Sequence, residues 1–163
     1  MSQYYKIVNL DKRQFLDPHK FGDGLKLMEF GNSGCGTLFG LTVLLADGNG
    51  RDGGDLDSDD PIIGSWAGDR VVVAGEYADG GRFLDDEPIG NLEKTARAHY
   101  TEDYAKPQNV TLYAYASDHF EDVSDRVIRA IAADKVHQHP LARLNLGETG
   151  VRNRPAWEEG GPP

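Results

Sequence analysis

The apolar runs of this 163-residue chain are short, and this feature most limits what it can fold into. The longest run, residues 38–46 (LFGLTVLLA), is far below the roughly 20 apolar residues that a membrane-spanning helix needs. We therefore expect no membrane span, and a core built from several short elements joined by turns. The length suits one domain, and 39% hydrophobic against 27% charged residues is typical of a folded chain.

Four segments have the composition or the alternation of β-strands. Residues 4–10 (YYKIVNL) and 70–77 (RVVVAGEY) are rich in aromatic and β-branched side chains. Residues 25–30 (LKLMEF) alternate apolar and polar positions between glycines, and residues 110–116 (VTLYAYA) put tyrosines on one face and apolar side chains on the other. We expect 70–77 and 110–116 to lie centrally in one sheet.

Helical patterns are fewer. Residues 122–134 give the clearest one, because four apolar side chains recur at helical spacing and either Asp122 or Ser124 can cap the N-terminus. Residues 91–104 predict a short surface helix. The run 38–46 is too uniformly apolar for its periodicity to decide between helix and strand, and a threonine that can cap it favours helix.

These patterns predict an α+β fold with a mainly antiparallel or mixed β-sheet. One C-terminal helix, at about 122–134, and one or two further short helices complete the expected fold. Residues 1–140 are predicted to form a single domain. Residues 141–163 are polar, contain Pro and Gly, and are expected to form a C-terminal tail.

The charge of the chain limits its partners. It has 17 Lys and Arg against 27 Asp and Glu, a formal net charge of −10, which repels nucleic-acid phosphates and anionic membrane surfaces. We therefore expect neither nucleic acid nor a membrane as partner. The single cysteine cannot form an internal disulfide, and the N-terminus lacks the basic and apolar segments of a signal peptide, so a cytoplasmic location is expected.

Residues 47–60 (DGNGRDGGDLDSDD) combine glycines with aspartates and predict a long exposed loop. Carboxylate oxygens are ligands that Ca²⁺ prefers, so a bound divalent cation such as Ca²⁺ is one interpretation and a solvated loop the other. The spacing opens like an EF-hand loop, but Asp60 stands where that loop needs glycine and Trp66 where it needs a chelating glutamate. The candidate metal ligands are Asp52, Asp55, Asp57 and Asp59.

Several reactive side chains stand in or beside turn-rich segments. A carboxylate can orient His19 as a general base, and a helix dipole with a histidine can activate Cys35 as a thiolate. Around Cys35, residues 31–36 have the glycine spacing of a phosphate loop but lack the lysine of a Walker A motif. The candidate catalytic residues are His19, Asp23, Cys35 and His119.

No catalytic set is complete in this sequence. We therefore predict a non-catalytic protein-binding or regulatory module that contacts a protein partner, or a second copy of itself, through the 47–60 loop and Trp157. One alternative is a small metal-assisted hydrolase that uses aspartates of this loop with His19 or His119 as the base. A third interpretation is a subunit of a larger assembly.

Overall fold

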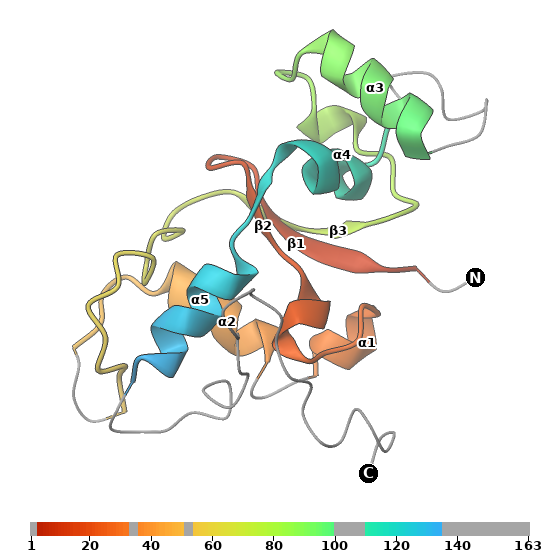
Figure 1. The fold of residues 1–163 in the computed structure, drawn as a ribbon. Coiled ribbons are helices and arrows are strands. Elements are labelled where there is room, and N and C mark those ends of the chain that lie inside the picture. Colours follow the sequence, from red (N-terminus) through yellow and green to blue (C-terminus); the bar gives the residue numbers. More distant parts are fainter. Residues whose placement is uncertain (1–2, 33–35, 51–53, 100–109, 135–163) are drawn as a thin grey trace. The chain divides into compact units, whose positions relative to one another are not determined.

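The structure is a computed structural model that describes residues 3–32, 36–50, 54–99 and 110–134 (Figure 1). The chain divides into two compact units, and each unit is made from two stretches of sequence. Unit 1 comprises Met1–Phe15 and Asp69–Asp122, and unit 2 comprises Leu16–Gly68 and Val123–Pro163. Within the described ranges, no helix combines the length and the apolar character that crossing a membrane requires.

A mixed four-stranded sheet in the order β3-β1-β2-β4 forms the base of unit 1 (Figure 1). β1 pairs with β3 in antiparallel orientation, with Ile7 opposite Val73, and β2 pairs with β4 in parallel, with Phe15 opposite Asp122. The α+β class and the mixed sheet are therefore as predicted. The strands are β1 Tyr5–Asn9, β2 Gln14–Leu16, β3 Val71–Gly75 and β4 Glu121–Asp122.

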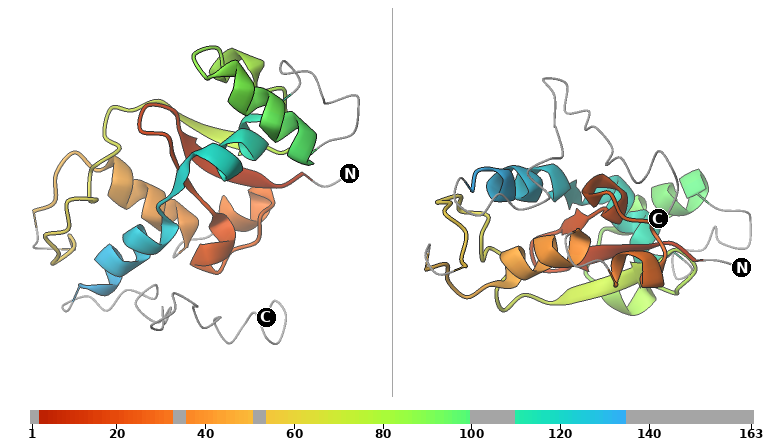
Figure 2. Two further views of the ribbon diagram at one scale, coloured as in Figure 1. Left: turned by 45° about the horizontal axis from the view of Figure 1, so that its top comes forward. Right: turned by 90° about the horizontal axis from the view of Figure 1, so that it is seen from below.

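Two helices cover one face of this sheet in layers. α4 (Leu112–His119) packs against β1 and β3, and α3 (Ile89–His99) packs against α4. The views in Figure 2 agree on this order of layers. Between the sheet and the helices lies a core of Val8, Phe15, Ala74, Leu84, Leu92, Val110, Leu112, Tyr115, Ala116 and Phe120.

Unit 2 is helical. It contains a short 3₁₀ helix, Pro18–Phe21, and the helices α1 (Leu27–Phe30), α2 (Thr37–Leu45) and α5 (Ser124–Ala132). α5 packs against α2 and against the 3₁₀ helix. After residues 47–60, called the acidic loop below, the chain returns to the end of α2. There Gly64 and Trp66 donate their N–H groups to the carbonyls of Val43 and Leu44, each at 2.9 Å. Trp66 is fully buried, as core packing predicts.

Three helix predictions are confirmed, at α2, α3 and α5, but the expected N-caps are wrong. The cap position of α5 is Val123, which makes no side-chain capping bond. Ser124 is already helical, and its hydroxyl accepts the N–H of Asp17 at 2.8 Å. The described residues contain four α-helices besides α5, where one or two were expected.

Two strand predictions are wrong. Residues 110–116 contain the start of α4, which begins at Leu112, because Leu112, Tyr115 and Ala116 also share one helical face and reach the core together. Thr111 caps this helix by accepting the N–H of Ala114. Residues 25–30 instead contain α1, in which the Glu29 carboxylate accepts the N–H of Lys26 at 3.0 Å.

The strands predicted at 4–10 and 70–77 are confirmed as β1 and β3. The expected central position of 70–77 is wrong, because β3 lies at an end of the strand order. The predicted tail, residues 141–163, lies outside the described residues, so the boundary at 140 stays a prediction.

Candidate interaction surface

Asp23 does not act as a free carboxylate. It is only 7% exposed, and its Oδ2 accepts both the N–H and the hydroxyl of Thr37, each at 2.7 Å. Thr37 is the first helical residue of α2, so the expected Thr37 cap is wrong, and Asp23 supplies the capping acceptor from a distant turn. A Cβ at Gly36 would lie 2.3 Å from this same oxygen, so glycine leaves the space for it.

Two of the other candidate catalytic residues lie within the described ranges, and each has contacts of its own. His19 is exposed, and its backbone N–H donates to Asp17 Oδ1 at 3.0 Å, so Asp17 caps the 3₁₀ helix. His119 belongs to unit 1, where its Nε2 lies 2.7 Å from Thr95 Oγ1 and its ring centroid 4.5 Å from that of Tyr115. Cys35 lies outside the described residues.

The side-chain amide of Asn49 bonds two ends of the described part of the acidic loop together. Asn49 Nδ2 donates to the carbonyl of Leu56 at 2.7 Å, and Asn49 Oδ1 accepts the N–H of the same residue at 3.1 Å. Asp55 accepts the N–H of Gly50 at 2.7 Å. A cleft of about 250 Å³ lies beside Asn49 and is also lined by Asp59.

No group of three or more His, Cys, Asp or Glu side chains gathers as metal ligands within the described ranges. Asp55, Asp57 and Asp59 are exposed there, and Asp52 lies outside those ranges. The metal site therefore stays a prediction, as does the contact through Trp157, which also lies outside the described residues.

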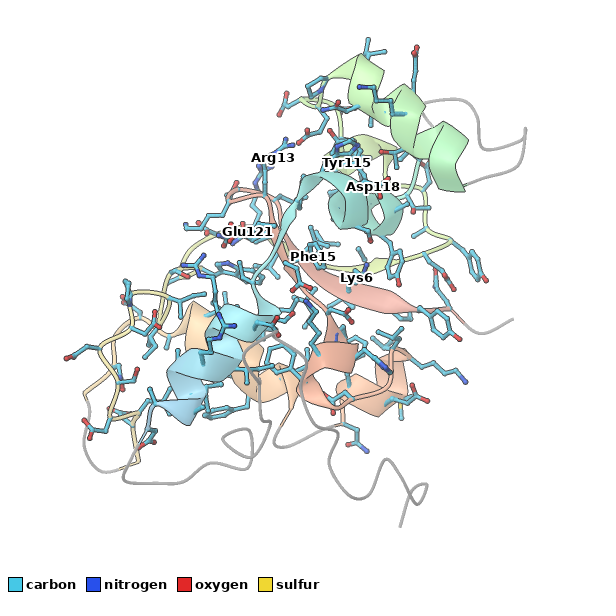
Figure 3. The ribbon with its side chains drawn as sticks, viewed as in Figure 1. Lys6, Arg13, Phe15, Tyr115, Asp118 and Glu121 are labelled. Atoms are coloured by element: carbon cyan, nitrogen blue, oxygen red, sulfur yellow. The ribbon has the colours of Figure 1, made fainter. Side chains whose placement is uncertain are left out.

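A polar cluster that no sequence motif indicated joins three segments of unit 1 (Figure 3). The Glu87 carboxylate accepts the hydroxyl of buried Tyr115 at 2.6 Å and pairs with the guanidinium of Arg13, which lies 4.9 Å from the ring centroid of Phe120. Burial, and then the bond to Glu87, raise the pKa of Tyr115. The bond to Glu87 also raises the pKa of Arg13. The hydroxyl of Tyr115 therefore stays neutral and donates its hydrogen bond to Glu87, which suits a structural role.

A second cluster surrounds Lys6 (Figure 3). Its ammonium lies 5.0 Å from the ring centroid of Phe15 and 4.4 Å from that of Tyr113, and it donates to the hydroxyl of Ser117. That hydroxyl donates in turn to the carbonyl of Tyr113 at 2.7 Å. A nucleophilic serine must donate to its base, so this direction of hydrogen bonding is that of a structural serine.

The outer edge of β3 is different, because its backbone groups point away from the sheet. Leu10 donates to the carbonyl of Arg70 at 3.0 Å, and Glu76 donates to the carbonyl of Tyr4 at 2.9 Å. With the observed register, these two bonds place the inward backbone groups of β3 at even-numbered residues. The backbone groups of Val71, Val73 and Gly75 therefore point outward.

No strand of the described residues pairs with this outer edge. Val73 is 44% exposed there. Gly75 is buried and its carbonyl accepts the N–H of Ala78 at 3.2 Å, so the outward groups left for a partner are those of Val71 and Val73.

A groove of about 190 Å³ runs beside β3. Its lining includes Val73, Phe83 and Leu112, and the Arg82 guanidinium stacks 4.4 Å from the ring centroid of Phe83. The groove wall is tight at Gly80, where a Cβ would lie 2.3 Å from the backbone nitrogen of Leu112. The open edge therefore adjoins a depression of mixed polar and apolar lining, which includes the charged side chains of Arg82 and Asp79.

Comparison with protein-family models, curated proteins and solved structures finds no match for this chain.

Proposed function

We propose that this chain is a non-catalytic protein-binding module, and that the open edge of β3 binds an extended segment of a protein partner. The observation that carries the proposal is the outward direction of the backbone groups at Val71 and Val73 beside the groove. An added strand gains main-chain hydrogen bonds from such an edge, and a neighbouring depression selects its side chains.

The composition of β3 supports this proposal. Proteins protect exposed sheet edges with proline, lysine, bulges or very short strands. β3 has none of these, because Val71–Gly75 is a five-residue strand with three consecutive valines. An edge left open in this way is suited to pairing with another chain.

The polar clusters of unit 1 give further support. The carboxylate of Glu87 holds Tyr115 and Arg13, and the hydroxyl of Ser117 is held between Lys6 and a carbonyl. These groups stabilise the packing of α4 on the sheet, and so they support the surface that β3 presents.

A random peptide library displayed on phage tests the proposal while the partner is still unidentified. We expect the wild-type protein to enrich peptides rich in β-branched residues. Val73→Pro removes an outward N–H but no bond to β1, which edge strands tolerate. It should weaken binding of the selected peptides about tenfold or more.

Two charge variants give a matched comparison. Val73→Lys places a charge on the edge, and Ile89→Lys makes the same change at a residue of α3 that is also exposed, at 67% against 44%. Circular dichroism checks that each variant folds. Peptides that bind Val73→Lys and Val73→Pro as well as wild type, or a library that yields no binders, would disprove the proposal.

A further inference from the structure

We propose that Asn49 and Gly50 form a self-modification site, at which the backbone nitrogen of Gly50 attacks the side-chain amide of Asn49 and ammonia is released. Asn49 is the one asparagine of the sequence that is followed by glycine. Because glycine has no Cβ, its backbone nitrogen can approach a neighbouring group closely. This inference goes beyond the proposed function, since it concerns the acidic loop of unit 2 and not β3.

The reaction closes a cyclic imide within the chain and then opens it. A bond forms between the Gly50 nitrogen and Cγ of Asn49, the bond between Cγ and Nδ2 breaks, and the proton of the Gly50 N–H leaves with Nδ2 as ammonia. Water then hydrolyses the imide at either of its carbonyls, which gives aspartate or isoaspartate at position 49. The net change replaces an amide by an acid, consumes water and involves no oxidation.

A carboxylate is in place to take the proton from the attacking nitrogen. Asp55 Oδ2 accepts the N–H of Gly50 at 2.7 Å, which is within the reach of a general base. A backbone nitrogen is a weak nucleophile while it keeps its proton, so an adjacent base activates it. This contact also requires glycine, because a Cβ at Gly50 would lie 2.6 Å from the same oxygen.

The amide under attack is held by the opposite side of the loop. Asn49 Oδ1 accepts the N–H of Leu56 at 3.1 Å, and this oxygen gains negative charge as the nitrogen adds to Cγ, so the N–H stabilises it. Asn49 Nδ2 donates to the carbonyl of Leu56 at 2.7 Å and to that of Ser58 at 3.3 Å. These bonds restrict the rotation of the side chain, which lowers the entropy cost of closing the ring.

The product differs from asparagine in hydrogen bonding and in charge. An ionised aspartate at position 49 has no N–H to donate, so the carbonyls of Leu56 and Ser58 lose their donor. It also adds a negative charge to the cleft that Asp59 lines. The reaction should therefore loosen the acidic loop as the protein ages.

Peptide mapping by mass spectrometry, during incubation at neutral pH, measures the conversion of residue 49. We expect wild type to convert about tenfold or more faster in the folded chain than in the chain unfolded in urea, because only folding places Asp55 on Gly50. Asn91, which precedes leucine in α3, is an internal reference in the same samples and should stay unconverted.

Two substitutions separate the base from the charge of the loop. Asp55→Asn keeps an acceptor for the N–H of Gly50 but removes the base. It should slow conversion of the folded chain about tenfold or more and leave the rate in urea unchanged. Asp59→Asn removes the same charge from the same loop and should convert at the wild-type rate. Circular dichroism checks that each variant folds.

The comparison of folded with unfolded wild type needs no substitution, so it decides the question even if a variant folds poorly. A folded chain that converts more slowly than the unfolded chain would overturn the proposal, because the hydrogen bonds of Asn49 would then protect its amide. A folded Asp55→Asn variant that converts at the wild-type rate would overturn it as well. Neither result bears on the binding of peptides at β3.

Discussion

Arg13 is the one non-glycine residue with a positive φ, +55°, among those that the structure describes. A left-handed backbone costs a residue with a Cβ about 1–2 kcal/mol. Several contacts of Arg13 offset this cost: its carbonyl accepts the N–H of Glu121 at 3.0 Å, and its side chain holds Glu87 and lies over Phe120. The turn between β1 and β2 therefore keeps an arginine where glycine would be conformationally easier.

Comparing two substitutions separates the strain at Arg13 from its contacts. Arg13→Ala and Arg13→Gly both remove the side-chain contacts, but only glycine relieves the strained φ. We expect both to lower the free energy of unfolding in urea, and Arg13→Gly to be more stable than Arg13→Ala by about 1 kcal/mol.

Arg82 provides the control for this comparison. It is an exposed arginine that also stacks on a phenylalanine, and it is not among the residues with positive φ. Its glycine variant should be no more stable than its alanine variant. If Arg13→Gly is no better than Arg13→Ala, the backbone at Arg13 is not strained.

The partners of individual residues were largely beyond prediction from sequence. Asp23 stood out as a carboxylate in a turn, but nothing local indicates that it binds Thr37 across an intervening helix. The cluster of Arg13, Glu87 and Tyr115 was missed altogether, because its members come from separate segments and form no motif. The sequence identified single reactive residues, but the side chains that contact them are brought together only by the fold.

At the level of elements, a pattern that fits one period was predicted, whereas ambiguous patterns were predicted at residues 38–46 and missed at residues 110–116. α5 was predicted because its apolar residues fit only a helical period. Residues 110–116 satisfy both a period of two and a helical face, and packing against the sheet favours the helix. The valines of β3 indicated a strand, but the central position expected for it is wrong, and Val73 is exposed.

Glycines at two helical positions should respond to the same substitution in opposite ways. In α2, a Cβ at Gly40 would lie 2.6 Å from Cε1 of Phe21, whereas in α3 a Cβ at Gly90 meets nothing within 4 Å. Gly40→Ala should therefore lower the free energy of unfolding by about 1–3 kcal/mol through overpacking. Gly90→Ala should raise it by about 0.5–1 kcal/mol, because alanine is the better helix former.

Thermal unfolding of the two glycine variants beside wild type measures both effects. A stabilised Gly40→Ala would mean that Phe21 moves aside at little cost. The short distance between Gly40 and Phe21 would then not determine how α2 packs inside unit 2.

At the level of the whole molecule, each unit joins segments that are distant in the sequence. β1 pairs with β3, and α2 packs against α5. Sequence patterns report only on neighbouring residues, so they could not predict the division into two units. The start of β3 is tied to the β1–β2 region by two carboxylates of unit 1. Asp11 accepts the N–H and side chain of Arg70, and Asp69 accepts the amide of Asn9 at 2.9 Å and the ammonium of Lys12 at 2.7 Å.

These two carboxylates should contribute to the response of the molecule to acid. The N–H and then the side chain of Arg70 lower the pKa of Asp11, and the bonds from Asn9 and then Lys12 lower the pKa of Asp69. Because both pKa values are lower in the folded state, their stabilisation is present above the ordinary pKa of about 3.9. It is lost as the pH falls through the lower folded values.

Urea unfolding at a series of pH values below about 6 measures this contribution. The Asp11→Asn, Asp69→Asn double variant should lose less stability on acidification than wild type. A control that replaces exposed Asp85 and Asp86 by asparagine removes the same number of charges and should follow the wild-type curve. Equal slopes for wild type and the first double variant would contradict the prediction.

The two ends of the sheet are unequal, since β3 has five residues and β4 has only two, Glu121 and Asp122. A partner segment that binds β3 covers the longer end of the sheet and leaves the short acidic end, β4, outside. Such an end offers little backbone to a further strand. Growth of this sheet by strand addition should therefore stop after one added segment, because β4 is too short to bind a second.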